Sequence, residues 1–360
     1  MKIAQIAPLY ESVPPKLYGG TERVVSYLTD ELVHQGHEVV LFASGDSMTE
    51  ARLVPVSRRA LRLEGPHVRD PIAHHVRMVE MVYRQLDEFD LVHFHIDYLH
   101  LSLASRSPVA ALTTLHGRLD IPDLIPLFHE FPNVNFVSIS NAQRKPLSWA
   151  NWRGTVYHGL PVGLYRFQEK PGSYLAFLGR ICPEKRVDRA IEIALHTGLE
   201  LKIAAKVDAV DRDYFESKIR PLLNNPLIEF VGEIGEDEKN EFLGNARSVL
   251  FPIDWPEPFG LVMIEAMACG TPTIAYRNGS VPEVLEDKRT GFIVDNLQDA
   301  VKAVDRISLL SRRTCREVFE RRFTASRMAF DYLAIYKALL SDEKGCLSAV
   351  SSKPVGGGRF

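Results

Sequence analysis

The segment from Trp255 to Pro272, WPEPFGLVMIEAMACGTP, joins a stiff loop to a short helix. Prolines and a glycine oppose helix formation over 255–260, so we predict that the helix begins near Gly260 or Leu261. The residues around Glu265 are apolar on every side, which indicates a buried helix in which this carboxylate needs a partner. The unpaired N–H groups at the start of such a helix are also a suitable site for phosphate.

On both sides of this segment, short β-rich runs alternate with helix-period segments, which is typical of parallel α/β sheets. The second half of the chain, roughly 168–320, contains such strands and helices at 174–178, 186–196, 201–205, 228–230, 248–251, 261–268 and 273–276. The first half, which ends near Pro161, contains them at 2–7, 21–35, 37–43, 73–86, 91–95, 110–115 and 135–139. We therefore expect two Rossmann-like halves whose strand ends face one cleft, where α/β proteins bind ligands.

The end of the chain is predicted to contain one amphipathic helix followed by a tail. Apolar residues recur at helical spacing over 325–341. The stretch 342–360 lacks periodicity, so we expect it to be flexible. We place domain boundaries at 1–165 and 166–324, with the helix 325–341 completing the first domain.

The composition excludes several classes of protein. The 360 residues carry a net charge of −3, which gives no reason to expect a nucleic-acid partner. The four cysteines are far apart, which disfavours zinc and disulfides and indicates a reducing cytosol. The opening MKIAQIAPLY lacks the long apolar run of a secretory signal, and no apolar stretch is long enough to span a bilayer. Six arginines over 312–327 indicate a solvated helix or, alternatively, a peripheral contact with anionic lipid on the inner face of the membrane.

Two glutamates eight positions apart, Glu257 and Glu265, identify a family resemblance. The E-x7-E pattern within EPFGLVMIEAMACGTP resembles the signature of the retaining glycosyltransferases of family 4, which have the GT-B fold of two Rossmann domains. The resemblance implies that Glu265 binds the donor ribose and that Glu257 contacts the transferred sugar. It also implies that Gly260, Leu261 and Val262 present backbone N–H groups to the donor phosphates.

A second motif, LGRICPEKR, follows the first strand of the second half and contains Arg180 and Lys185. Two cations that converge on a diphosphate would stabilise the charge that grows on this leaving group. The motif is similar to the diphosphate clamp of the same family, which implies a catalytic role for both residues.

The segment Tyr18-Gly19-Gly20-Thr21 joins the first loop to the first helix. Glycines allow close approach of the backbone to a ligand, although a plain turn would use them equally well. By resemblance to the family, in which this loop covers the donor diphosphate, Gly19 and Gly20 are predicted to bind the donor.

Polar residues also follow the strands of the first half. His116 resembles the family histidine that reaches the donor sugar, so we expect a catalytic role for it. His95 and Asp97 are predicted to face the acceptor, although His95 fits a capped turn equally well. Ser140 and Asn141 occupy a matching strand end and are weaker acceptor-side candidates. His158 stands where the family usually has asparagine.

Three further features concern the base and metals. The loop 231–235, which includes Ile234, resembles the stretch that pairs with the nucleobase, and Lys206 is a weaker donor-binding candidate. The sequence DRD at 211–213 looks like a metal motif, but we interpret it as a capped helix start. We therefore expect neither a metal nor a cofactor.

Together these features predict a retaining glycosyltransferase that moves a hexose from a nucleoside-diphosphate sugar, preferably UDP-glucose or another UDP-sugar, to an unknown hydroxyl acceptor. Polysaccharide or glycoconjugate synthesis is the expected setting. Alternatives are a GT-B-type sugar-nucleotide epimerase, a sugar phosphorylase or a regulator that binds nucleotide sugars without catalysis.

Overall fold

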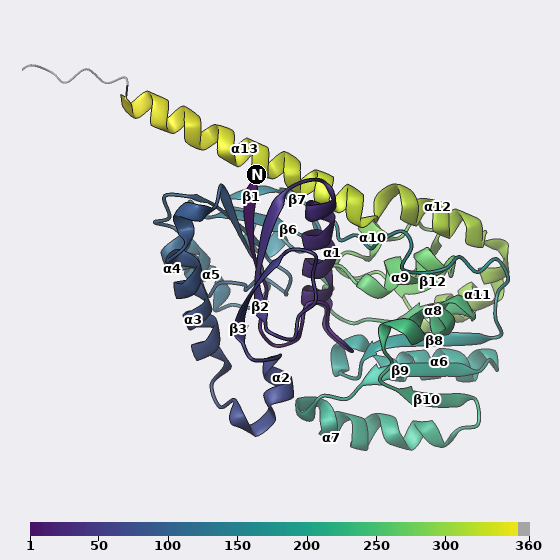
Figure 1. The fold of residues 1–360 in the computed structure, drawn as a ribbon. Coiled ribbons are helices and arrows are strands. Elements are labelled where there is room, and N and C mark those ends of the chain that lie inside the picture. Colours follow the sequence, from purple (N-terminus) through teal and green to yellow (C-terminus); the bar gives the residue numbers. More distant parts are fainter. Residues whose placement is uncertain (352–360) are drawn as a thin grey trace, which may run out of the picture.

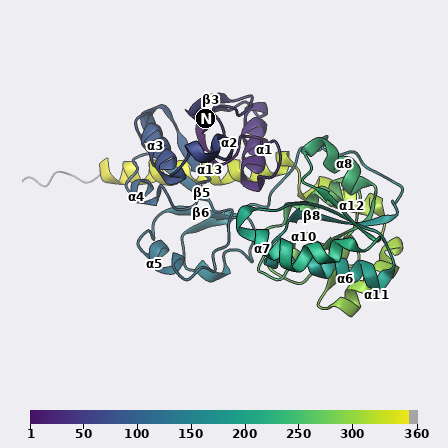
Figure 2. The same cartoon turned by 90° about the horizontal axis from the view of Figure 1, so that it is seen from below.

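The computed structural model describes residues 1–351 and contains two parallel sheets with helices on both faces (Figure 1). The strands of the first sheet lie within residues 2–155, and those of the second lie within 174–294. The two sheets lie in separate halves of the molecule, as Figure 2 also shows. The α/β class and the two Rossmann-like halves predicted from the sequence are confirmed.

The first sheet has seven parallel strands. Their spatial order is β3 (Arg52–Ser57), β2 (Glu38–Ser44), β1 (Lys2–Ile6), β4 (Leu91–Phe94), β5 (Ala110–Thr114), β6 (Asn135–Ser138) and β7 (Trp152–Thr155). The order reverses direction between β1 and β4. A crevice forms at such a switch point, beyond the carboxyl ends of the strands.

The second sheet has six parallel strands. Their order is β10 (Ile228–Gly232), β9 (Leu201–Lys206), β8 (Tyr174–Arg180), β11 (Ala246–Phe251), β12 (Thr273–Tyr276) and β13 (Gly291–Val294). Here the order reverses between β8 and β11. Each of these two strands leads directly into one of the loops that the sequence analysis selected.

Helices cover both faces of each sheet. In the first half these are α1 (Gly20–His34), α2 (Leu61–Glu64), α3 (Pro71–Tyr83), α4 (Leu101–Ala104) and α5 (Leu124–His129). In the second half they are α6 (Val187–Thr197), α7 (Arg212–Tyr214), α8 (Glu236–Gly244), α9 (Leu261–Cys269), α10 (Val281–Val284), α11 (Leu297–Arg306) and α12 (Arg312–Arg322). Because helices cover both faces, the central strands are buried on both sides and read as continuous apolar runs.

Three edge strands, β3, β7 and β13, were not predicted from the sequence. The edge strand β3 contains Pro55, which weakens a strand pattern, and β7 is only four residues long. β3 pairs with β2, and β7 pairs with β6. These neighbouring strands are held in place by the buried centre of the sheet. Tertiary pairing therefore determines these strands more than local composition does.

The last helix, α13 (Ala325–Ser351), returns from the second half and packs on the first (Figure 1). Its Met328, Tyr332 and Tyr336 are buried against Val24 and Leu28 of α1. The prediction that a tail begins at 342 is wrong for the described part, because the helix continues to Ser351. A helix that has already formed extends at little cost, and the single Gly345 costs only about 1 kcal/mol. Residues 352–360 of the predicted tail lie outside the described residues.

The arginines over 312–327 mostly contact the chain itself. Arg312 is 7% exposed and donates hydrogen bonds to the carbonyl oxygens of Gln168, Gly244 and Ala246. Arg316 and Arg327 likewise donate to backbone carbonyls. The expectation of a solvated face is therefore wrong for these three side chains. The predicted lipid contact stays a prediction. Within residues 1–351, no helix is long and apolar enough to cross a membrane.

Candidate active site

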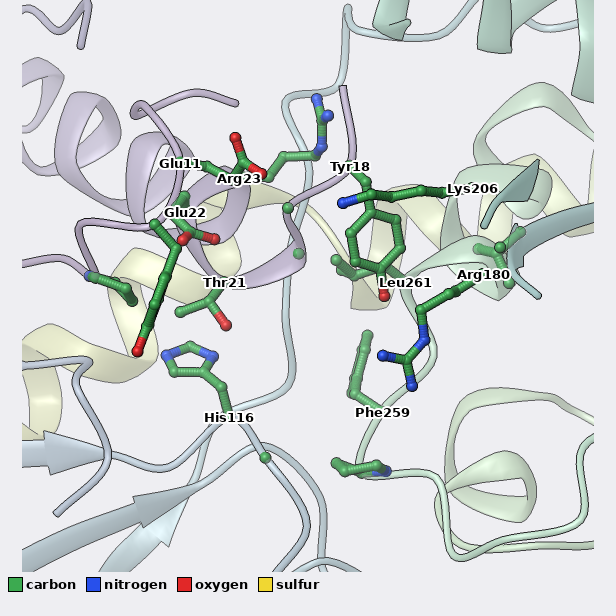
Figure 3. A pocket seen from close by; sticks show the side chains of 18 of the residues that line it. Glu11, Tyr18, Thr21, Glu22, Arg23, His116, Arg180, Lys206, Phe259 and Leu261 are labelled. Carbon is green, nitrogen blue, oxygen red and sulfur yellow. The ribbon is translucent and has the colours of Figure 1, made fainter. Parts of the chain in front are cut away.

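A cavity of about 640 Å³ lies between the two halves, at the carboxyl ends of the central strands. Figure 3 shows Thr21, Glu22 and His116 on one side of it and Arg180, Phe259 and Leu261 on the other. We call the first side, which belongs to residues before 160, the first wall. The second wall is formed by residues after 175. Both switch points of the sheets therefore open into the same space.

Glu257 is placed by the stiff loop that follows β11 and is 8% exposed. Its carboxylate forms an ion pair with Lys185 and accepts a hydrogen bond of 2.9 Å from the indole nitrogen of Trp255. The Lys185 ammonium also lies 5.2 Å from the centre of the Trp255 ring. Gly279 packs against the backbone of Glu257 so closely that a Cβ atom would lie 2.3 Å from its carbonyl oxygen. The loop is therefore held firmly, and two of the predicted catalytic residues are in contact.

Arg180 ends β8 and points toward the cavity. Its guanidinium lies 3.7 Å from Asp208 and 3.6 Å from Asp211, and among the described residues its Nε has no hydrogen-bond partner. The Asp211 carboxylate makes no capping hydrogen bond to α7. The interpretation of DRD as a helix cap distant from the site is therefore wrong. The fold brings Asp211 to Arg180, a contact that sequence spacing does not reveal.

Glu265 is 3% exposed in α9, as the all-round apolar pattern predicts. It accepts hydrogen bonds from the Lys239 ammonium at 2.8 Å and from the Tyr165 hydroxyl at 3.3 Å. Burial alone would raise the pKa of Glu265, but Lys239 and Arg23 outweigh it and hold the pKa below its ordinary value. The buried carboxylate is therefore a charged acceptor.

Two helix N-termini also reach the cavity. Gly19 and Gly20 lead into α1, and Gly260, Leu261 and Val262 form the start of α9; all five line the cavity. Gly260 has φ of 82°, and a Cβ atom there would lie 2.7 Å from Met263. Only glycine fits this left-handed position at low cost. Both starts direct unpaired N–H groups and a positive dipole end toward any bound anion.

The predicted base-binding side also lines the cavity. Ile234 is 8% exposed in the loop between β10 and α8. Lys206, at the end of β9, lies 3.0 Å from Asp208 and 5.5 Å from the centre of the Tyr18 ring. The base-binding and donor-binding roles of these two residues stay predictions.

The first wall is supported by a chain of buried polar side chains. His116 Nε2 lies 2.9 Å from His95 Nδ1, and His95 Nε2 lies 2.8 Å from Oε1 of the Gln5 side chain. The side-chain amide Nε2 of Gln5 donates a hydrogen bond of 3.2 Å to the Tyr336 hydroxyl of α13. Burial lowers the pKa of His116 to about 3, and it lowers the pKa of His95 far below its ordinary value. These imidazoles are therefore neutral near pH 7.

The acceptor-side predictions have mixed outcomes. His95 and Asp97 line the cavity, and their acceptor role stays a prediction. Ser140 and Asn141 lie elsewhere: the Ser140 hydroxyl accepts the Gln143 N–H, and the Asn141 N–H donates to Glu283 of α10. Neither residue lines the cavity, because the turn after β6 and the contact between the halves engage them, and their acceptor role stays a prediction.

Several lining residues were not predicted from the sequence, among them Tyr10, Glu11, Glu22 and Lys239, and His158, which was noted without a role, also lines the cavity. Glu22 was within reach of sequence reasoning, because it follows the YGGT segment and occupies the first turn of the helix. Lys239 was not, because its pairing with Glu265 depends on how α8 packs on α9.

Two family profiles match consecutive parts of the chain. The profile described as glycosyl transferases group 1 matches residues 166–321, and the profile described as glycosyltransferase family 4 matches residues 18–161. The chain is a group 1 glycosyltransferase of the family 4 type. The two matches fall on the two halves that form the cavity walls.

Known proteins resemble this glycosyltransferase over different extents. The glycogen synthase of Thermodesulfovibrio yellowstonii is 28% identical over 180 residues, which is 47% of this chain and 36% of the relative. The chain therefore matches well under half of that relative's length. The sucrose-phosphate synthase of Thermosynechococcus elongatus superposes with a TM-score of 0.78 at 19% identity, covering 95% of this chain and 99% of the other. The Anabaena protein HepE, solved with UDP-glucose, superposes with a TM-score of 0.71 at 15% identity, covering 95% and 100%. These two structures share the GT-B fold with this chain.

Proposed function

We propose that this glycosyltransferase transfers a hexose from a UDP-sugar, with UDP-glucose as the favoured donor, to a hydroxyl acceptor with retention of the anomeric configuration. The meeting of Arg180, Lys185, Glu257 and Glu265 at one cavity supports this proposal most directly. The complex of HepE with UDP-glucose, which has the same fold, supports a UDP-sugar as the donor.

In the proposed reaction the diphosphate leaves from the sugar. The bond between the anomeric carbon and the diphosphate oxygen breaks, and the bond to the acceptor oxygen forms on the same face. The acceptor proton passes to the departing diphosphate, so no protein base is needed. Arg180, Lys185 and the N-termini of α1 and α9 stabilise the charge that accumulates on the leaving group. The carboxylates of Glu257 and Glu265 accept hydrogen bonds from hydroxyls of the sugar and the ribose.

The proposal assigns the phosphate charge to side chains and helix ends, without a metal or a cofactor. Activity is therefore expected to persist in EDTA. A loss of activity that Mg²⁺ or Mn²⁺ restores would contradict this assignment.

A thermal-shift panel of UDP, GDP, ADP and dTDP with their glucose conjugates tests the donor. A ligand at 100 times its Kd adds about 2.7 kcal/mol of stability, and UDP-glucose should give the largest shift. NMR of the product then reports the anomeric configuration and the release of UDP. Inversion would refute retention, and an epimerised donor without an acceptor product would favour the epimerase alternative.

A further inference from the structure

The first wall contains side chains that the donor proposal does not use. They are Tyr10, Glu11, Arg62, Asp97 and Tyr98, together with Glu22 in the first turn of α1. The two tyrosines are 38% and 46% exposed and both line the cavity. Aromatic faces and carboxylates are groups that contact sugar rings and their hydroxyls through packing and hydrogen bonds.

Glu22 is the most unusual of these side chains. It is 6% exposed, it faces the cavity beside Thr21 and His116 (Figure 3), and no cation among the described residues forms an ion pair with it. Burial raises the pKa of Glu22 to about 7, although backbone amides of Glu22 and Glu11 and the charge of Arg62 favour its ionised form. A buried carboxyl that has no ion-pair partner among the described residues is suited to hydroxyl groups.

The cations of the first wall are already paired. Arg62 donates to Glu11 at 2.8 Å, and Arg23 forms an ion pair with Glu236 while donating to the Leu17 carbonyl oxygen. Burial holds the pKa of His75, His95, His116 and His158 below the ordinary value, so these lining histidines are neutral near pH 7. A phosphate on this wall would therefore meet carboxylates without a free compensating cation among residues 1–351.

We infer that the first wall binds an uncharged sugar or polyol as acceptor, with Glu22 accepting a hydrogen bond from one of its hydroxyls, and that it rejects acceptors with a phosphate near the reacting hydroxyl. This inference rests on the proposed glycosyl transfer. It assigns the donor to the cationic second wall together with the N-terminus of α1, and the acceptor to the neutral-to-acidic remainder of the first wall. Rejection follows because like charges across a desolvated site are unfavourable.

The experiment compares acceptors at a fixed donor, chosen from the thermal-shift panel. Glucose, mannose, galactose and N-acetylglucosamine are each assayed against their 6-phosphates, with glucosamine as a cationic probe, and nucleotide release is measured with and without each acceptor. Each uncharged sugar should exceed its phosphate at least tenfold in kcat/KM. The inference would be overturned if no uncharged sugar had a higher kcat/KM than its 6-phosphate, or if glucosamine were the only acceptor used.

The variant Glu22→Gln tests the assigned residue. Its acceptor KM should rise roughly 10-fold, because a charge-assisted hydrogen bond becomes a weaker neutral one. Glu31→Gln, on the same helix but outside the cavity, is the matched control and should leave this KM unchanged. An unchanged acceptor KM in Glu22→Gln would contradict the assignment.

Donor binding separates failure of this inference from failure of the proposed function. If UDP-glucose binds and is slowly hydrolysed while the acceptor preference is wrong, only the inference fails. If no nucleotide sugar binds, the proposed function itself fails.

Discussion

The two walls of the cavity handle buried charge in opposite ways. On the second wall, buried carboxylates are paired with lysines, as in Lys185–Glu257 and Lys239–Glu265. On the first wall, buried histidines are neutral, and no cation among the described residues forms an ion pair with Glu22. In a wall of ion pairs, a charged ligand can replace one partner of a pair. A wall of neutral polar groups is matched to a ligand without charge.

The largest expected effect concerns the buried histidines. Burial lowers the pKa of His100 to about 3, so the unfolded chain takes up a proton below pH 6.5 that the folded chain does not. The stability from this residue is present above pH 6.5 and is lost as the pH falls toward 3, by about 3 kcal/mol at pH 4.5 and about 4 kcal/mol near pH 3. Urea unfolding of wild type between pH 7.5 and 4.5 should show this steep loss.

His100→Gln should lose less stability with acid than wild type does. His196→Gln, at an exposed position, is the control and should match the wild-type slope. Equal slopes for all three proteins would mean that His100 titrates normally despite its burial.

The second wall is tested by removing its cations. Arg180→Ala and Lys185→Ala should each lower kcat by about 100-fold to 1,000-fold, the usual cost of removing a group that stabilises developing charge. Thermal unfolding checks that both variants fold. Arg313→Ala, whose side chain is 69% exposed outside the cavity, should keep wild-type turnover. Wild-type turnover in Arg180→Ala and Lys185→Ala would refute the clamp.

The unpaired carboxyl of the first wall has a stability effect of its own. The pKa of Glu22 is raised to about 7, so ionisation destabilises the folded state increasingly between pH 4.5 and 7. Glu22→Gln should therefore be more stable than wild type by about 3 kcal/mol above pH 7 and about equal to it below pH 4.5. Denaturant unfolding at pH 4.5 and 8 measures both values, with Glu31→Gln as the control. No gain at pH 8 would show that this carboxylate has a partner in solution.

The smallest expected effect concerns the contact between the two halves. The Glu283 carboxylate accepts hydrogen bonds from the backbone N–H groups of Asn141 and Ala142 at 2.7 and 2.6 Å. Glu283→Gln should cost about 1–2 kcal/mol in denaturant unfolding, because two charge-assisted bonds become weaker. Glu320→Gln breaks only an exposed helical pair and should cost less than about 0.5 kcal/mol. Equal costs would mean that Glu283 does not hold the halves together.

The walls also differ in how much of them the sequence predicts. The second wall lies mostly in two continuous motifs, so Arg180, Lys185, Glu257 and Glu265 could be selected without a structure, and all four line the cavity. The first wall depends on Gln5, His95, His116 and Tyr336, which are up to 331 residues apart. No local period or spacing links such positions, because their contacts arise only from strand order and helix docking.

The same limit explains the errors at Asp211 and Arg312. Each was interpreted by its neighbours in sequence, as a helix cap and as part of a solvated face. Asp211 instead faces Arg180, and Arg312 binds carbonyl groups of distant loops. A charged residue reveals its type in the sequence, whereas the identity of its partner depends on the fold.

The return of α13 to the first half also affects biosynthesis. Tyr332 and Tyr336 complete the apolar layer over β1, β4 and β5 and bond to Thr114 and His93. During translation, the amino-terminal sheet emerges from the ribosome long before the helix that covers it. Its final packing must therefore wait until the chain has been made beyond α13, and a nascent chain stalled before residue 325 would expose that uncovered face to chaperones.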